Sequence, residues 1–251
     1  STSMATTPTP LHVLQHTFGY SGFRGQQGDI IDHIVGGGNA FVLMPTGGGK
    51  SLCYQIPAIC RDGVGIVVSP LIALMQDQVA ALRQLGIRAA ALNSATPAQE
   101  AHATKAMMRE GAIDLVYVAP ERLLMDDFLA LLAQTPLALF AIDEAHCVSQ
   151  WGHDFRPEYM KLGALSEKFP AVPRLALTAT ADTPTRRDIV ERLGLKDGKI
   201  YVAGFDRPNI TYAVVEKDNP RAQLLAFIRQ NHIGDSGIVY CLSRKKVEET
   251  A

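Results

Sequence analysis

The sequence has little that would mark its protein as secreted, membrane-bound or zinc-dependent. Its 251 residues include four cysteines, and these form neither a CxxC pair nor a Cys/His cluster with zinc spacing, so we expect reduced thiols and no zinc. No apolar run approaches the ~20 residues that cross a bilayer, and the polar start is unlike a signal peptide. We therefore expect a cytoplasmic protein without a membrane partner.

An excess of charge of one sign is also missing. The chain has 24 Lys+Arg against 25 Asp+Glu, a net charge of -1. A nucleic-acid partner would therefore have to bind in a local groove, because no global positive field could attract it. Hydrophobic residues make up 47% of the chain, which is enough for a sizeable core.

Short apolar segments alternate with helical segments along most of the chain. Helices around a turn are predicted over residues 11–35, and further helices over 71–85 and 96–110. Strands are predicted over residues 40–44, 64–69, 89–92, 113–118, 137–142 and 174–178. Continuous apolar strands separated by helices predict a parallel sheet with helices on both faces, and a site at the carboxyl ends of the strands.

The alternation pauses near residues 204–209 and then restarts, which predicts a second α/β domain. We expect residues 1–10 to be a disordered tail that includes residues left from cloning. Residues 11–206 would form the first domain, and residues 207–251 the truncated start of the second.

A glycine-rich loop, PTGGGKS at residues 45–51, follows the first predicted strand and precedes a helix. Such a loop lets backbone amides surround phosphates, while Lys50 reaches the terminal phosphates and Ser51 ligates magnesium. Met44 stands where the pattern GxxxxGK[ST] has its first glycine, which is unlike a routine kinase or GTPase loop. The alternative is a glycine-rich turn with a chance lysine. The predicted nucleotide contacts in the loop are Thr46, Gly47, Gly48, Gly49, Lys50 and Ser51.

Two adjacent acids, Asp143 and Glu144, follow the predicted strand 137–142. There Asp143 could hold the magnesium ion through water, and Glu144 could orient the attacking water and accept its proton. With Lys50, they are the predicted catalytic residues. The alternative is a solvated helix start.

An aromatic and basic run follows the acids directly. The spacing of Trp151, Phe155 and Tyr159 by four residues would fit a buried helical stripe, but Gly152 and Pro157 disfavour a regular helix there. Exposed aromatic rings could instead stack on single-stranded bases without reading their sequence. We expect Tyr159 to be structural and residues 151–156 to face a nucleic acid.

Three of these segments, GGGKS (47–51), DEAH (143–146) and LTAT (177–180), resemble motifs I, II and III of superfamily-two helicases. Residues 18–27, 51–55, 69–78 and 147–159 resemble the RecQ DNA helicase family in particular. The resemblance implies an α/β fold: a RecA-like P-loop domain whose mostly parallel sheet is sandwiched by helices, plus the beginning of a second RecA-like domain.

The resemblance also implies roles for single residues. Gln27 would hydrogen-bond the adenine edge while Tyr20 and Arg24 pack on its faces; the alternative is a hydrophobic cluster of Phe18, Tyr20 and Phe23. Residues 69–71 and 119–122 would touch a nucleic-acid backbone. The residues implied to bind DNA or to couple it to the nucleotide are His146, Gln150, Trp151, His153, Phe155, Arg156, Thr178 and Thr180.

By this resemblance the protein is an ATP- and Mg2+-dependent 3' to 5' DNA helicase in repair and recombination, acting at a bacterial nucleoid on single-stranded and partially duplex DNA. Motifs V and VI, with their arginine, do not follow, so we expect this chain to bind nucleotide but to hydrolyse it poorly. Two alternatives are a DEAD/DEAH-type RNA helicase and a nucleotide-switched DNA-binding module without turnover. Nothing in the sequence indicates protein partners.

Overall fold

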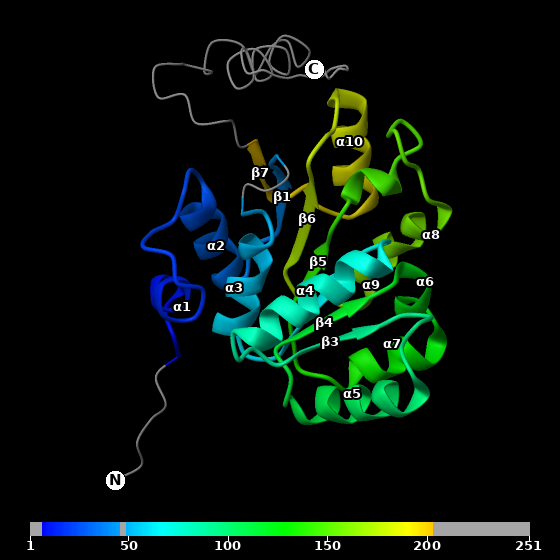
Figure 1. Ribbon diagram of the computed structural model, residues 1–251. Helices are drawn as coiled ribbons and strands as arrows, with labels where there is room; N and C mark the ends of the chain where they lie inside the picture. The colour runs from blue at the N-terminus through cyan, green and yellow to red at the C-terminus, as the bar shows by residue number, and fades with distance from the viewer. Residues whose placement is uncertain (1–6, 46–48, 203–251) are drawn as a thin grey trace.

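A seven-stranded sheet organises residues 7–45 and 49–202, which are the residues that the computed structural model describes (Figure 1). Its strand order is β3-β4-β2-β5-β6-β1-β7, and every adjacent pair is parallel. The strands are β1 (Ala40–Leu43), β2 (Val64–Val68), β3 (Ala89–Leu92), β4 (Leu115–Val118), β5 (Leu137–Ile142), β6 (Arg174–Thr178) and β7 (Lys199–Val202). Parallel neighbours need crossover connections, and helices supply them.

Alternate residues of each inner strand enter two separate cores, one on each face of the sheet. In β1, Phe41 and Leu43 pack into one core and Val42 into the other, as the two-residue period of a strand requires. The first core is covered by α5 (Ala98–Glu110), α7 (Asp126–Ala133), α9 (Ala164–Lys168) and α10 (Thr183–Arg192). The second is covered by α2 (Gln27–Val35), α3 (Leu52–Cys60) and α4 (Ile72–Gln84).

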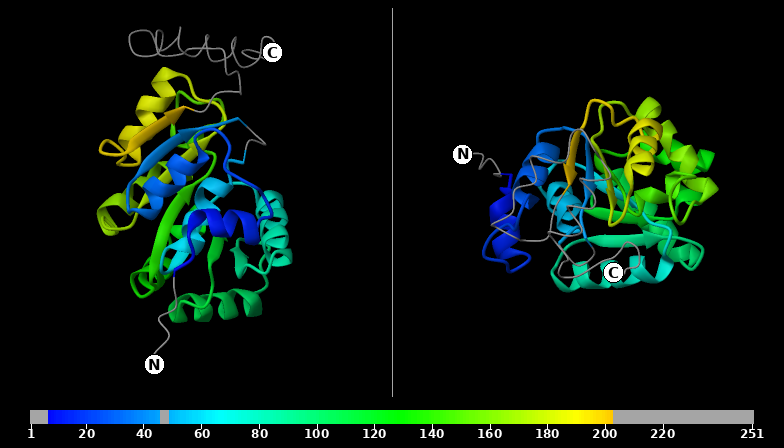
Figure 2. Two further views of the ribbon diagram at one scale, coloured as in Figure 1. Left: turned by 90° about the vertical axis from the view of Figure 1, so that its left-hand side faces the viewer. Right: turned by 90° about the horizontal axis from the view of Figure 1, so that it is seen from above.

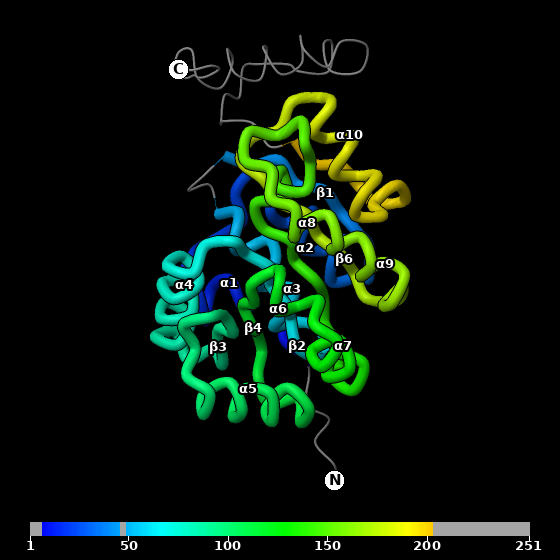
Figure 3. Tube along the Cα trace, turned by 90° about the vertical axis from the view of Figure 1, so that its right-hand side faces the viewer, coloured from blue at the N-terminus to red at the C-terminus, as the bar shows by residue number. Residues whose placement is uncertain are grey.

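The remaining helices are short and complete these two layers. Helix α1 (Pro10–His16) packs outside α2 and α3 through Val13 and Leu14. In the right-hand view of Figure 2 the blue α1 and α2 lie on one side of the molecule and the yellow α10 lies on the other. Helices α6 (Pro120–Leu123) and α8 (Pro157–Met160) lie with α7 on the side seen in Figure 3. Between β5 and α9 the chain passes through the 3-10 turn η1 (Ala145–Val148), then α8, then the 3-10 turn η2 (Lys161–Gly163).

The predicted α/β fold, with a parallel sheet between helices, is confirmed, and all six predicted strands are present. Strand β7 was not predicted. It is a four-residue edge strand in which Lys199 and Ile200 are exposed, so it lacks the burial on both faces that marks the inner strands. The predicted second domain, residues 207–251, lies outside the described residues.

Side chains cap two carbonyl groups on the outer edge of β3. The Nε of Arg83 donates a 2.8 Å hydrogen bond to the carbonyl of Ala89, and the hydroxyl of Thr96 donates one of 3.0 Å to the carbonyl of Ala91. Both acceptors are therefore satisfied although, among residues 7–45 and 49–202, no strand lies beyond β3 in the sheet.

Two observations bear on cysteine use and on membranes. In the described part of the chain, Cys53, Cys60 and Cys147 are buried free thiols, as predicted. The longest helices there, α4 and α5, have 13 residues each, and none of the described helices is both long and apolar enough to span a bilayer.

Candidate nucleotide and nucleic-acid site

Three predicted motifs lie at the carboxyl ends of neighbouring strands. The glycine-rich loop follows β1, the two acids follow β5, and Thr178 ends β6. These strands are adjacent in the order β5-β6-β1 and run parallel, so their ends meet at one edge of the sheet. This is the edge at which open α/β sheets bind their ligands.

At this edge the lysine of the loop meets both acids. Lys50 Nζ lies 3.6 Å from Asp143 Oδ1 and 4.0 Å from Glu144 Oε1, and the side chains of Lys50 and Asp143 are only 12% and 10% exposed. Gly49, Lys50, Ser51 and both acids line one cavity of about 540 Å³, which is a usual size for a ligand pocket. Thr46, Gly47 and Gly48 lie outside the described residues.

The chemistry of this cavity fits a magnesium nucleotide. Its hydroxyl and carboxylate oxygens, on Ser51, Asp143 and Glu144, are the hard donors that magnesium prefers. Lys50 is the one cation among the described residues that line the cavity, and it supplies a charge for phosphate. Burial, and then the neighbouring Asp143 carboxylate, raise the pKa of Glu144, which makes that carboxylate a better proton acceptor.

Glu144 has an unusual backbone conformation that the sequence did not predict. With φ 52° and ψ 44° it is the only non-glycine residue with positive φ in the described ranges. A left-handed residue costs about 1 to 2 kcal/mol, and such strain is typical of functional sites. The turn is held by the amide of Glu144, which donates a 3.0 Å hydrogen bond to Asp143 Oδ1.

The predicted adenine residues lie beside the phosphate loop. Gln27 is buried, and its Oε1 accepts from the Arg24 amide at 2.9 Å while its Nε2 donates to the Gly49 carbonyl at 3.3 Å. Tyr20, Arg24, Gln27 and Gly49 line one cavity of about 90 Å³. Gln27 therefore joins the predicted base-recognition segment to the phosphate loop.

The hydrophobic-cluster alternative holds for two of its three aromatic residues. Phe18 and Phe23 pack against the core between α1, α2 and α3. Tyr20 is 51% exposed, so its ring is available at the mouth of the cavity.

A chain of polar contacts leads from Glu144 to the end of β6. His146 Nε2 lies 3.5 Å from Glu144 Oε2, and His146 Nδ1 shares a 2.8 Å hydrogen bond with the hydroxyl of Thr178. The Thr178 hydroxyl is also 3.0 Å from the carbonyl of Thr180. Burial lowers the pKa of His146 to about 4, so the imidazole is neutral near pH 7. The structure thus brings His146, Thr178 and Thr180 together with the acids.

The aromatic run is not a buried helical stripe. Trp151 is 71% exposed and lies outside any helix, whereas Tyr159 is fully buried. The Tyr159 hydroxyl donates a 2.9 Å hydrogen bond to the backbone carbonyl of Asp143, so its predicted structural role is confirmed.

The other predicted residues of this loop lie close to the acids or at the surface. His153 stacks on His146 with ring centroids 4.4 Å apart, and the Arg156 amide donates to the Cys147 carbonyl at 2.9 Å. Gln150 is exposed and Phe155 is partly buried.

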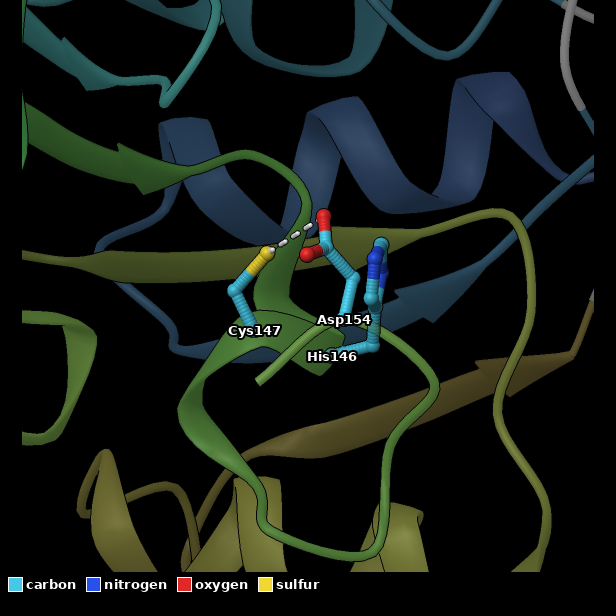
Figure 4. Close-up of side chains that lie close together, drawn as sticks. All are labelled: His146, Cys147 and Asp154. Carbon is cyan, nitrogen blue, oxygen red and sulfur yellow. Dashed lines mark hydrogen bonds between the residues drawn. The ribbon is translucent and has the colours of Figure 1, made fainter. Parts of the chain in front are cut away.

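Asp154 holds this loop through contacts with its neighbours, although its side chain is 46% exposed. Figure 4 shows it with His146 and Cys147, and one ligand atom of each lies within 4.8 Å of the others. The Cys147 thiol points at Asp154 Oδ2 at 3.9 Å, and Arg156 pairs with the same oxygen at 3.3 Å. Burial raises the pKa of Cys147 to about 12, and Arg156 already neutralises the carboxylate. The cluster therefore fits a hydrogen-bonded anchor better than a metal site.

One wall of the large cavity was not predicted. Helix α4 contributes Leu74, Asp77 and Gln78. On sequence alone these residues lie within a motif whose predicted contacts were those of residues 69–71, and a glutamine in a helix normally indicates a solvated face.

Comparison with known proteins agrees with the motifs. Residues 24–189 match the family model for the DEAD/DEAH box helicase. The chain is 49% identical over 244 residues to the ATP-dependent DNA helicase RecQ of Haemophilus influenzae, which covers 97% of this chain and 39% of that protein. It is 43% identical over 238 residues to the protein of the same name from Bacillus subtilis, covering 94% of this chain and 40% of that one.

The fold is also found among solved structures. The DEAD-box helicase Mss116, bound to ssRNA and UDP-BeF, matches with a TM-score of 0.62 at 18% identity, over 80% of this chain and 44% of that one. At that identity the likeness concerns the fold alone. The chain spans about two fifths of the length of the two bacterial relatives.

Proposed function

This chain belongs to the DEAD/DEAH box helicases and, within them, to the RecQ family, and from that premise we propose that it is the nucleotide-binding part of an ATP-dependent DNA motor. The observation that carries the proposal is the meeting of Lys50 with Asp143 and Glu144 at the strand ends. There a lysine for phosphate and two acids for metal and water share one cavity, as phosphoryl transfer requires.

In this proposal the loop binds the phosphates and the N-terminal segment binds the base. Lys50 contacts the terminal phosphates, and Ser51 and Asp143 hold Mg2+. Magnesium, when bound, neutralises the charge that develops on the transferred phosphoryl group. Tyr20 and Arg24 pack on adenine and Gln27 reads its edge; Gln27 is already fixed between Arg24 and Gly49, which supports its role as a preformed contact.

Glu144 accepts the proton of the attacking water in the proposed mechanism. The raised pKa of Glu144 supports this role, since a more basic carboxylate binds that proton better. His146 stays neutral beside it, with its Nε2 3.5 Å from the carboxylate.

We propose that the loop carrying Trp151 reports bound DNA to the nucleotide. Its exposed ring suits stacking on single-stranded bases, and the stacked His153 and His146 connect the loop to Glu144 and Thr178. Translocation from 3' to 5', unwinding of partly duplex DNA in repair and recombination, and a place in the cytoplasm at the nucleoid complete the proposal. Residues 69–71 and 119–122 would contact the DNA backbone.

We further propose that this chain on its own binds ATP but turns it over slowly. Lys50 alone among the described cavity-lining residues carries positive charge, and an additional arginine at the γ-phosphate is worth about 10³ to 10⁵ in rate. ATPase assays of the chain test this directly. Fast, DNA-stimulated turnover by the chain alone would contradict it.

The coupling is best tested in a chimera in which this chain replaces the matching segment of the Haemophilus influenzae relative. ATP hydrolysis is measured with and without single-stranded DNA, for the parent chimera and for Lys50→Ala and Trp151→Ala. We expect Lys50→Ala to abolish turnover and Trp151→Ala to keep basal turnover while losing DNA stimulation. The exposed Met125→Ala is the control for loss of a surface apolar side chain.

The same assay separates the alternative functions. Stimulation by RNA instead of DNA would favour an RNA helicase, against the DNA helicase names of the sequence relatives. ATP-dependent DNA binding with no turnover under any condition would favour a nucleotide-switched binding module.

A further inference from the structure

Gln78 occupies the centre of a polar cluster under the phosphate loop. It extends from α4 and donates a 3.2 Å hydrogen bond from Nε2 to the hydroxyl oxygen of Ser51. Its other amide atom, Oε1, accepts from Tyr54 Oη at 3.3 Å, Gln55 Nε2 at 3.0 Å and Tyr117 Oη at 3.0 Å. A predicted metal ligand is thus joined to α3, α4 and β4.

The Gln55 amide nitrogen sets the orientation of the Gln78 amide, because the hydroxyls of Tyr54 and Tyr117 can either donate or accept. An amide has two donor hydrogens on nitrogen and only acceptor sites on oxygen, so turning it over would place NH2 against the Gln55 amide nitrogen, which can only donate. Tyr54, Gln55 and Tyr117 are all buried, and a lost partner there would leave unsatisfied polar groups. The Gln78 NH2 group is therefore directed at Ser51 by its surroundings.

A directed donor restricts the Ser51 hydroxyl. A hydroxyl oxygen has two acceptor sites and one hydrogen. When Gln78 occupies one acceptor site, the hydroxyl hydrogen points elsewhere and one acceptor site remains for a cation. Gln78 and Ser51 line the same cavity as Asp143, so this remaining site belongs to the proposed magnesium pocket.

We propose that Gln78 is a positioning residue that orients the Ser51 hydroxyl for the magnesium ion of the bound nucleotide. The inference rests on the proposed function, in which Ser51 is a magnesium ligand. It gives α4 a role at the nucleotide in addition to the predicted contact of residues 69–71, directly before α4, with the DNA backbone.

A purely structural role is the competing interpretation, because the same cluster holds α3 against α4 and β4. The structural and the positioning interpretations predict different effects on stability and on nucleotide affinity. Loss of a structural contact lowers stability and weakens nucleotide binding with or without magnesium. Loss of the Ser51 contact weakens only the part of the binding that depends on magnesium.

The test measures the affinity of the chain for a fluorescent ATP analogue over a titration of free Mg2+, with EDTA as the magnesium-free reference. For Gln78→Met we expect the gain in affinity on adding Mg2+ to fall about fivefold, the worth of one hydrogen bond, with the affinity in EDTA unchanged. Gln76→Met is the control, since Gln76 is an exposed glutamine on the same helix. Thermal unfolding of each variant checks the fold.

Two further variants keep the test decisive if Gln78→Met does not fold. Gln78→Asn retains an amide but is one methylene too short to bond Ser51 and the three donors together, so the magnesium-dependent gain should again fall. Tyr117→Phe removes one donor to Gln78 and leaves the Ser51 hydrogen bond. It should lower the unfolding temperature without altering the dependence on magnesium.

A double-mutant cycle with Ser51→Ala completes the design. If Gln78 acts through Ser51, Gln78→Met has no further effect on magnesium dependence once Ser51 is alanine. An undiminished effect in that background, or equal losses in EDTA and in Mg2+, would overturn the proposal. If Ser51→Ala leaves the magnesium dependence unchanged, the failure lies in the magnesium site of the proposed function and the inference falls with it.

Discussion

The ammonium of Lys50 lies 3.6 Å from a carboxylate oxygen of Asp143, and both side chains are mostly buried. A charge on the glycine-rich loop is thus neutralised by a charge at the end of β5. A phosphate group that enters the cavity meets a lysine that is already in place. The negative charge of the phosphate then competes with the Asp143 carboxylate for the Lys50 ammonium. The pair therefore links two strand ends before any ligand binds.

Lys50→Ala should weaken the binding of ATP by this chain about tenfold or more. The variant removes a charged hydrogen-bond donor, worth about 1.5 to 3 kcal/mol, and leaves Asp143 and Glu144 without their cation. Isothermal titration with ATP and Mg2+ measures the effect. Lys168→Ala, at an exposed position of α9, should bind as the parent does; equal affinities for all three proteins would place the phosphates elsewhere.

Trp151→Ala should weaken the binding of a single-stranded oligonucleotide by about fivefold to more than a hundredfold. This range corresponds to the 1 to 3 kcal/mol per base of an aromatic stacking contact. Since the ring is 71% exposed, the free energy of unfolding should change by less than about 0.5 kcal/mol. Fluorescence anisotropy and urea unfolding check the two expectations, and an unfolded variant would restore the buried-stripe interpretation.

Tyr159→Phe should lower the stability of the fold and leave oligonucleotide binding unchanged, the opposite of Trp151→Ala. It removes the buried hydrogen bond to the Asp143 carbonyl and should lower the free energy of unfolding by about 1 to 2 kcal/mol. Because Tyr159 is fully buried, oligonucleotide affinity should stay within a factor of two of the parent value in the same anisotropy assay. A large loss of affinity without a loss of stability would assign the ring to the nucleic acid.

Gly49→Ala should disrupt the contact between the phosphate loop and the adenine segment. Gly49 has a φ of 79°, and a Cβ there would overlap Gln27 Nε2. Gly86→Ala is the matched control, because Gly86 has a φ of 83° and open space around the same Cβ position. Both variants should lose about 1 to 2 kcal/mol of stability through the backbone.

Only Gly49→Ala should in addition lose ATP affinity, measured by titration of the purified chain. Adding Gln27→Ala should remove the overlap without restoring that affinity, since the base contact is then lost as well. Normal ATP binding by Gly49→Ala would show that Gln27 moves aside freely.

Acid should destabilise the chain through His146. Its pKa is lowered from 6.5 to about 4 in the folded protein, so between these values the unfolded chain binds a proton that the folded chain does not. The contribution of His146 is complete above pH 6.5 and decreases as the pH falls, by about 1.5 kcal/mol between pH 6.5 and 5. Urea unfolding of His146→Asn should show a smaller loss over this interval, whereas the exposed His102→Asn should follow the parent.

The sequence predicted the sheet well because its inner strands are buried on both faces. Runs such as Leu137–Ile142 are apolar throughout, and that pattern depends on no distant contact. Strand β7 is a short, partly exposed edge strand, and its place depends on pairing with β1, which a local pattern cannot encode.

The candidate site was predicted in its members but not in its geometry. Motif spacing placed Lys50 and Asp143 at strand ends, and parallel pairing then brought them together. The direction of the Gln78 amide depends on contacts between residues that are far apart in the chain, as Gln78 and Tyr117 are, and the left-handed backbone of Glu144 follows from no residue type that favours it. Local sequence contains no signal for either.

The two capped carbonyls on the outer edge of β3 affect how molecules of this protein meet one another in solution. A neighbouring chain that approached this edge as an extra strand would need the carbonyls of Ala89 and Ala91 as acceptors, and Arg83 and Thr96 already occupy them. An open strand edge is a template for aggregation. The caps should therefore oppose assembly of concentrated protein edge to edge at β3.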